Sequence, residues 1–336
     1  MKTVAFFNNK GGVGKTTLVH HLAWMYHELG LRVLAVDLDP QSNLTSAFLP
    51  LERLEELWPL GDHPQTILGA MKPLMERLGD LAPPHVECVD QSLFSALSLV
   101  PGDLGLSLFE DRLSEAWPRC QSDNQAEAAD AFRVMSAFHR VMSSAAAEAS
   151  VELVLIDVGP NLGAINRAAL IAADFVVVPL GADLFSLQGL RNLGPALATW
   201  RRGWQKRLGN EARPPGLLMP AGQIKPIGYV IVQPVMRPDR PVKAYLLWID
   251  RIRGEYRRQI LDHADEDETG APDPHLLATI RHSMSLMPLA HEARKPMFAL
   301  KPADGAIGSH ALAARDFRRD FHELALRIAS AAGVSL

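Results

Sequence analysis

The chain has 336 residues, a formal net charge of −4 and a pI of about 6.3. With 48% hydrophobic and 21% charged residues, it is expected to fold and not to present a uniformly basic surface. Two cysteines, Cys88 and Cys120, are too few for a zinc or disulfide framework. Together with the lack of a signal-like or membrane-spanning segment, they predict a cytoplasmic protein without integral membrane association.

The first elements in chain order form a β-α-β unit. Residues 3–7 are a short apolar run, and a glycine-rich stretch follows it. Apolar residues then recur at helical spacing from Leu18 until Gly30 ends the pattern, and residues 32–37 form a second apolar run. A helix that connects two consecutive strands in this way makes the strands parallel.

Further buried strands are predicted at residues 151–157, 175–179, 227–233 and 276–280, and a final amphipathic helix at 311–332. Strands that alternate with helices predict an α/β fold with a mainly parallel twisted sheet flanked by helices on both faces. Residues 51–149 contain prolines, a short strand at 97–100 and helices near 126–147. They are interpreted as a mostly helical insertion into one domain that spans residues 1–336.

A glycine-rich loop between the first strand and the first helix predicts a phosphate-binding site. Backbone N–H groups in such a loop can surround phosphate oxygens, and the positive end of the next helix adds to the attraction. The lysine near the loop's end would reach the β- and γ-phosphates of a nucleotide, and the hydroxyl after it would bind Mg²⁺. A plain glycine turn is the alternative. The residues are Lys10, Gly11, Gly12, Val13, Gly14, Lys15, Thr16 and Thr17.

The loop departs from the common spacing G-x-x-x-x-G-K-[ST], because Asn9 stands at the place of the first glycine. Instead a second lysine, Lys10, opens the motif. This form resembles the deviant P-loop of the ParA/MinD family, most closely of ParA-type partition ATPases. The resemblance implies ATP-dependent homodimerisation in which Lys10 reaches the nucleotide of the partner subunit. The spacing alone shows only a lysine near phosphate.

Three carboxylates follow predicted strands at the same edge of the sheet as the phosphate loop. Asp37 and Asp39 lie in Asp37-Leu38-Asp39-Pro40-Gln41, which resembles a segment of the family, and Asp157 ends an apolar strand. The resemblance implies that Asp39 orients or deprotonates the attacking water and that Asp37, Asp39 and Asp157 support Mg²⁺ together with Thr16. The alternative for the first two is a turn cap. Gly159 stands where the family usually has proline.

The resemblance also places the adenine base against Gln233, Pro234 and Arg281. Relatives often have proline where Arg281 stands.

A basic stretch suggests contact with DNA phosphates. Seventeen residues without an acid contain five basic side chains, interleaved with Trp200 and Trp204, and a second group lies at residues 251–258. An ordinary solvated helix face is the alternative. The five residues are Arg191, Arg201, Arg202, Lys206 and Arg207.

The predicted function is an ATP-dependent dimerising switch that hydrolyses ATP slowly, uses Mg²⁺, binds DNA without sequence preference and segregates or positions it. A ParB-like or other partner protein would stimulate hydrolysis, and the protein would associate with the nucleoid. The same switch acting on a non-DNA cargo or a membrane-associated, MinD-like machine is the first alternative. A cluster-carrying ATP-dependent reductase is the second. The final helix is expected to pack against the sheet instead of a membrane, because its arginines are offset by acids.

Overall fold

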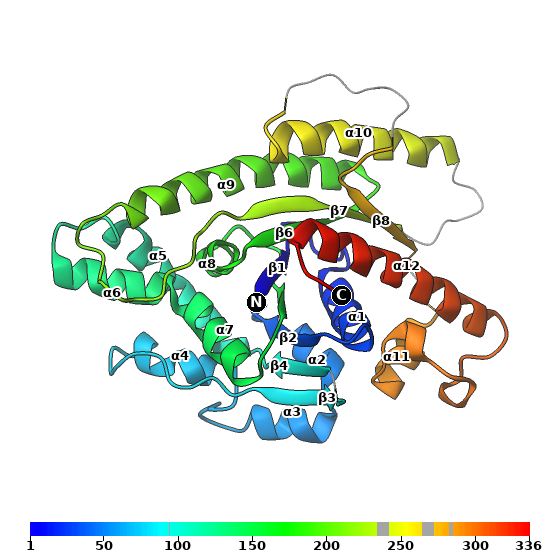
Figure 1. The fold of residues 1–336 in the computed structure, drawn as a ribbon, viewed down its shortest axis with the longest axis horizontal. Helices are drawn as coiled ribbons and strands as arrows, with labels where there is room; N and C mark the ends of the chain where they lie inside the picture. The colour runs from blue at the N-terminus through cyan, green and yellow to red at the C-terminus, as the bar shows by residue number, and fades with distance from the viewer. Residues whose placement is uncertain (94, 234–241, 264–271, 282–284) are drawn as a thin grey trace.

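The computed structural model describes residues 1–93, 95–233, 242–263, 272–281 and 285–336. Within these ranges, eight strands form one sheet in the order β3-β4-β2-β5-β1-β6-β7-β8 (Figure 1). The strands are β1 (Lys2–Phe6), β2 (Arg32–Asp37), β3 (Glu87–Gln91), β4 (Ala96–Val100), β5 (Leu153–Asp157), β6 (Phe175–Gly181), β7 (Lys225–Gln233) and β8 (Leu276–Arg281). The predicted α/β fold is confirmed, and each predicted strand is present within two residues of its expected limits.

Neighbouring strands pair in parallel except β3, which runs antiparallel to β4. Parallel pairing brings the carboxyl ends of the central strands to one edge of the sheet. In register, Asp157 at the end of β5 pairs with Phe6 of β1 on one side and with Asp37 of β2 on the other. The phosphate loop and two of the predicted carboxylates therefore meet at this edge.

Helices cover both faces of the sheet, because the central strands are apolar on both sides. In β1, Val4 and Phe6 face one core while Ala5 faces the other, and all three are fully buried. The first core lies under α1 (Lys15–Glu28), α2 (Asn43–Phe48), α3 (Leu51–Leu57), α11 (Met287–Ala293) and α12 (Ser309–Ala332). The second lies under α4 (Ile67–Met75), α5 (Phe109–Arg119), α6 (Gln125–Met135), α7 (Ala137–Glu148), α8 (Ala164–Ala172), α9 (Leu184–Leu208) and α10 (Val242–Ile260).

The last helix packs inward, as predicted. Phe317, Phe321 and Ile328 of α12 are buried in the first core, and the Tyr26 hydroxyl of α1 donates to the Ala325 carbonyl oxygen at 2.9 Å. Burial of each of these large side chains contributes roughly 1.5–3 kcal/mol. No helix in the described ranges is both long enough and apolar enough to cross a membrane.

Residues 51–149 contribute to the central sheet as well as to its helical cover. β4 pairs with β2 in parallel, and Phe109, Phe132 and Phe138 are buried in the same core as α8 and α9. β3 was not predicted from the sequence. Its residues, Glu-Cys-Val-Asp-Gln, lack an apolar face, as expected for an edge strand that faces water.

Candidate functional site

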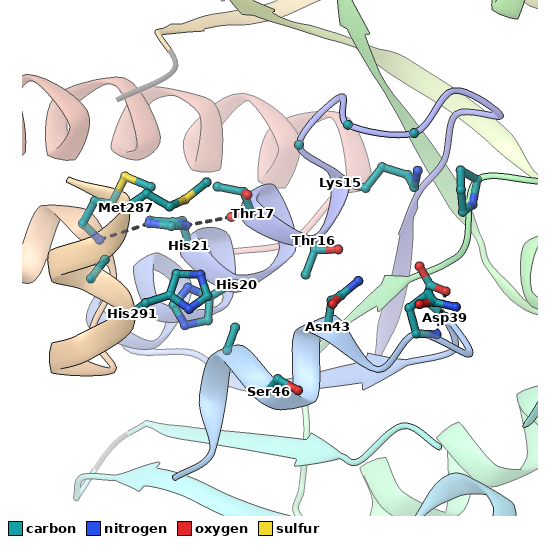
Figure 2. Close-up of a pocket in the computed structure, with 18 of the residues that line it drawn as sticks. Lys15, Thr16, Thr17, His20, His21, Asp39, Asn43, Ser46, Met287 and His291 are labelled. Atoms are coloured by element: carbon teal, nitrogen blue, oxygen red, sulfur yellow. Dashed lines mark hydrogen bonds between the residues drawn. The ribbon is translucent and has the colours of Figure 1, made fainter. Parts of the chain in front are cut away.

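The phosphate loop connects β1 to the N-terminus of α1. Gly12 (φ 71°) and Gly14 (φ 78°) have left-handed backbone conformations, which a side chain would strain. A cavity of about 490 Å³ lies against the loop (Figure 2). The cavity also borders the first turn of α1, where the backbone N–H groups of any helix have no partner within the helix.

Lys15 lies at the inner wall of this cavity, as the motif predicts. Its side chain is almost fully buried, and Nζ donates to the carbonyl oxygens of Asn8 at 3.3 Å and of Lys10 at 3.4 Å. Burial lowers the pKa of Lys15, although Asp157 and Asp39 oppose that shift. A desolvated ammonium held by neutral carbonyls is suited to an incoming anion.

Thr16 lines the cavity and contacts Asp157 at the end of β5. The Thr16 hydroxyl donates to Asp157 Oδ2 at 2.7 Å, while Asp157 Oδ1 is buried and has no hydrogen-bond partner among the described residues. Burial, and then the neighbouring Asp37, raise the pKa of Asp157 to about 8. A hydroxyl beside a buried carboxylate oxygen with spare acceptor capacity fits hydrated Mg²⁺, which prefers oxygen ligands.

Asp37 and Asp39 have different surroundings. Asp39 lines the cavity, and its Oδ1 accepts from the Gln41 backbone N–H at 3.0 Å. Asp37 is fully buried; its Oδ2 accepts from the backbone N–H and the hydroxyl of Thr45, both at 2.8 Å, and its Oδ1 from the Asp39 N–H at 3.3 Å. Burial raises the pKa of Asp37 to about 7. These contacts assign Asp37 to the support of the turn, and its predicted part in the Mg²⁺ site stays a prediction, because a carboxylate can accept more than one contact at each oxygen.

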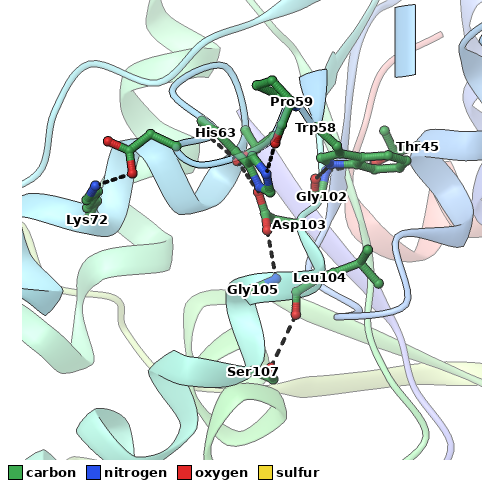
Figure 3. A network of polar contacts seen from close by, with 12 residues as sticks. Thr45, Trp58, Pro59, His63, Lys72, Gly102, Asp103, Leu104, Gly105 and Ser107 are labelled. Atoms are coloured by element: carbon green, nitrogen blue, oxygen red, sulfur yellow. Dashed lines mark hydrogen bonds and ion pairs between the residues drawn. The ribbon is translucent and has the colours of Figure 1, made fainter. Parts of the chain in front are cut away.

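A polar network from residues 51–149 supports this turn (Figure 3). The Gly102 N–H, just after β4, donates to the Thr45 hydroxyl at 2.8 Å, and the Trp58 indole donates to the Gly102 carbonyl at 3.2 Å. The next residue, Asp103, is fully buried and accepts from the Thr66 hydroxyl at 2.6 Å. The segment therefore fixes the turn on which Asp39 stands.

Lys10 lies outside the cavity that contains Lys15. Its Nζ forms an ion pair with Asp183 Oδ2 at 2.5 Å and lies 5.8 Å from the centre of the Phe185 ring. Asp183 also caps α9 by accepting from the Ser186 N–H. Burial alone would raise the pKa of Asp183, but the hydrogen bonds from Lys10 and Ser186 together with the charge of Lys10 outweigh burial and lower that pKa. The two lysines of the motif thus face different sides of the loop.

The far end of the cavity contains residues that the sequence did not single out (Figure 2). His21 Nδ1 lies 2.7 Å from the Thr17 carbonyl oxygen, and the Met297 N–H donates to its Nε2 at 3.0 Å. These partners fix a neutral ring, and burial lowers the pKa of His21 to about 4. Met287, Met297 and His291 complete this end. Thr17 and His21 are four residues apart on α1, and this spacing was the one sign in the sequence that both could lie on the side of the helix that faces the nucleotide.

The residues predicted to bind adenine lie close to the loop, as far as they are described. The backbone of Gln233 pairs with that of Arg281, and Pro234 lies outside the described residues. Arg281 is exposed and borders a small cavity of about 20 Å³ that Gly14 and Thr17 also line. Such a space holds about one water molecule.

The predicted DNA-binding residues do not form one surface. Arg207 is buried: its Nε donates to the Trp117 carbonyl at 2.6 Å, and its guanidinium lies 3.6 Å from the centre of the Trp117 ring. Its assignment to DNA binding is therefore corrected. Arg201 is partly buried and donates to the carbonyl oxygens of Gln223 and Ile224.

The other three basic residues of α9 remain accessible. Arg191 is about half exposed and forms an ion pair with Glu255 of α10 at 2.8 Å, and Arg258 contacts the same carboxylate. Arg202 and Lys206 are exposed on the outer side of α9. The exposed positive charge is therefore smaller than the sequence suggests.

The fold and the loop define a P-loop nucleotide-binding protein of the α/β class. A family model described as "AAA domain" matches residues 1–209. The chain belongs to this family, and its relatives place it in the ParA/MinD family of ATPases. The resemblance found in the motif is thereby confirmed.

Three curated relatives have similar identities. Protein IncC of Escherichia coli is 29% identical over 60% of this chain, the chromosome partitioning protein ParA of Caulobacter vibrioides 29% over 62%, and the cell division protein PomZ of Myxococcus xanthus 30% over 56%. The matches span 47%, 66% and 49% of those proteins, respectively, which is about half to two thirds of their length.

Solved structures share the fold over the whole chain. Protein DIP2308 of Corynebacterium diphtheriae superposes with a TM-score of 0.68 at 23% identity, covering 98% of this chain and 99% of the other. The ATP complex of a Cyanothece McdA variant gives a TM-score of 0.64 at 17% identity, covering 100% and 98%.

Proposed function

We propose that this protein is an ATP-dependent dimerising switch that hydrolyses ATP and uses the cycle to segregate or position DNA. The placement of the two motif lysines carries the proposal. Lys15 faces the phosphate cavity of its own subunit, whereas Lys10 lies at the rim of the sheet edge in an ion pair with Asp183. A lysine in that position is available to a second subunit that approaches the same edge.

In the proposed reaction, the loop and Lys15 bind the triphosphate, and Asp39 orients the attacking water. Thr16 and Asp157 would hold Mg²⁺, which when bound would offset the negative charge of the phosphates. The partner's Lys10 equivalent supplies a further positive charge in trans. Met287 and Met297 offer an apolar wall for the flat base next to the Arg281 side of the loop.

Two observations favour DNA as the partner that the ATP-bound dimer binds. Relatives of this chain include proteins named for chromosome partitioning, and Arg202 and Lys206 leave a basic strip exposed on α9. Such a strip would bind phosphates without reading bases, so binding should weaken steeply with salt. A partner protein that stimulates hydrolysis would then release the dimer from DNA.

A membrane cargo is the weaker alternative. The apolar face of α12 is buried against the sheet and α1, which leaves Leu312 and Leu326 as the exposed large apolar side chains of that helix. Two separate leucines are a smaller apolar surface than the wide face with which interfacial helices enter a bilayer.

The experiment compares wild type with Lys10→Ala in ATP, ADP and no nucleotide. Light scattering measures mass, and sedimentation with DNA at several salt concentrations measures binding. Wild type should double its mass and bind DNA only with ATP. Lys10→Ala should bind ATP with near-normal affinity yet remain monomeric or inactive. A wild-type protein that stays monomeric in ATP, with or without DNA, would contradict the proposal.

A further inference from the structure

The loop between β5 and α8 passes close beside Asp39. If residue 159 carried a Cβ, that atom would lie 3.3 Å from Asp39 Oδ1 and 3.7 Å from Asn161 Nδ2. Gly159 does not have the positive φ that would require glycine for the backbone. Glycine therefore lets this loop lie close to the Asp39 carboxylate, with the amide nitrogen of Asn161 near the same position.

The orientation of the Asn161 amide is set by two donors. Its Oδ1 accepts from the Gly163 N–H at 2.9 Å and from Asn166 Nδ2 at 3.0 Å, so the other end of the amide must be the nitrogen. Asn166 is buried and also donates to the Gly159 carbonyl at 2.9 Å, so that α8 holds the loop at two points. Within the described part of the chain, Asn161 Nδ2 donates to no acceptor.

We propose that Asn161 Nδ2 and Asp39 Oδ1 together hold the water that attacks the γ-phosphate, an inference that rests on the ATPase function proposed above. The water oxygen would accept a hydrogen bond from Asn161 and donate one to Asp39. These two contacts fix its orientation and leave a lone pair for phosphorus, which is how positioning lowers a barrier. Asn161 is thus a water-positioning residue supplied by the loop after Asp157.

The chemical step balances without a further reactant. The water oxygen forms a bond to the γ-phosphorus while the bond from that phosphorus to the β–γ bridging oxygen breaks, which leaves ADP. The proton displaced from the water departs through Asp39. Asn161 keeps both of its amide protons throughout.

A purely structural role of Asn161 predicts a different mutant behaviour. Aspartate at this position would keep the acceptor that binds Gly163 and Asn166, and aspartate is as suitable as asparagine in such turns. It would, however, replace the N–H donor with a carboxylate oxygen that faces the Asp39 carboxylate. Asn161→Asp therefore distinguishes the role of Asn161 in holding the turn from its role as a hydrogen-bond donor to water.

The test measures ATP affinity and the single-turnover hydrolysis rate at saturating ATP and Mg²⁺. Asn161→Asp should lower the rate by about 30-fold or more while ATP affinity changes by less than about 3-fold. Gly159→Ala, which leaves the hydrogen bonds of Asn161 in place, should lower the rate by roughly 10-fold by crowding Asp39. The matched control is Asn124→Asp, because Asn124 caps α6 through the same kind of bonds to Ala126 and Glu127; it should behave as wild type.

An unchanged hydrolysis rate in either folded variant overturns the inference. A fall in ATP affinity that accounts for the lost rate also overturns it, because that result would assign Asn161 to binding. Wild-type protein that neither binds nor hydrolyses ATP would instead contradict the proposed function.

Discussion

The phosphate loop and the outer helix α9 both contribute buried basic side chains that donate to backbone carbonyls, yet only one of them is placed to meet phosphate. Lys15 borders a cavity of about 490 Å³, whereas the guanidinium of Arg207 is covered by the ring of Trp117. Open space beside the charge, and not the charge itself, distinguishes the two.

The difference follows from how the sequence of each segment determines the direction of its basic side chains. Glycines with left-handed conformations at residues 12 and 14 bend the loop around a space, so the motif specifies the direction of Lys15. On α9 the helical period decides: Trp200, Trp204 and Arg207 are spaced by four and three residues and turn inward together, while Arg202 and Lys206 turn outward.

The largest expected effect is on the rate of ATP hydrolysis, and it comes from a substitution beside the phosphate loop. Asp39→Ala should bind ATP but hydrolyse it at least about 100-fold more slowly, because it removes the group that orients the water. The variant should accumulate as an ATP-bound dimer in light scattering. A monomeric Asp39→Ala protein with wild-type turnover would contradict the role of Asp39.

On the α9 side, Arg207 should matter for stability. Arg207→Ala leaves the Trp117 carbonyl without its donor and removes the cation–π contact, so the free energy of unfolding should fall by about 2–3 kcal/mol. Denaturant titration measures this fall. Arg202→Ala, at an exposed position of the same helix, serves as the control and should change it by less than about 0.5 kcal/mol. Equal effects of the two variants would contradict the inward and outward assignment.

The outward side chains should instead affect DNA. Changing Arg202 and Lys206 together to glutamate should weaken ATP-dependent DNA binding and lower the slope of log affinity against log salt by about 2. ATP affinity should not change. Glutamates in place of Arg315 and Arg319, exposed on α12, make the same change in charge elsewhere and should leave the salt slope unaltered. If both double variants lose DNA equally, the strip on α9 has no special role.

The smallest effect concerns pH at the far end of the cavity. Burial holds the pKa of His21 at about 4, below its value in the unfolded chain, so the unfolded state binds the extra proton first as pH falls. The contribution of neutral His21 to the free energy of unfolding is fully present above about pH 6.5 and is lost as the pH falls toward 4. At pH 5 the loss amounts to about 2 kcal/mol. The free energy of unfolding should therefore fall more steeply from pH 7 to 5 in wild type than in His21→Gln. Parallel curves would show that His21 ionises freely.

The sequence was sufficient to predict those elements that a motif or a hydrophobic periodicity specifies. The predicted parallel strands, the phosphate loop and the inward face of α12 follow from apolar runs, glycine spacing and helical periodicity. The metal role of Asp37 was predicted from the resemblance of its segment to the family, whereas the hydrogen bonds that Thr45 donates to Asp37 depend on a contact between β2 and α2. No local pattern records such a contact.

The remaining features depend on residues far apart in sequence. The bond between His21 and Met297 joins residues 276 positions apart, and the brace of Thr45 by Gly102 spans 57. Lys10 meets Asp183 across 173 positions. Each contact follows from the order of strands in the sheet, which periodicity does not specify.

The most direct test of the central claim mixes two inactive variants, Lys10→Ala and Asp39→Ala, both of which should bind ATP. If Lys10 acts on the partner's nucleotide, the mixed dimer contains one complete site, formed by Asp39 and ATP of one subunit and Lys10 of the other. Hydrolysis should then reappear at up to about a quarter of the wild-type rate. If the mixture hydrolyses no more ATP than the separate variants, Lys10 acts within its own subunit and the dimeric switch is contradicted.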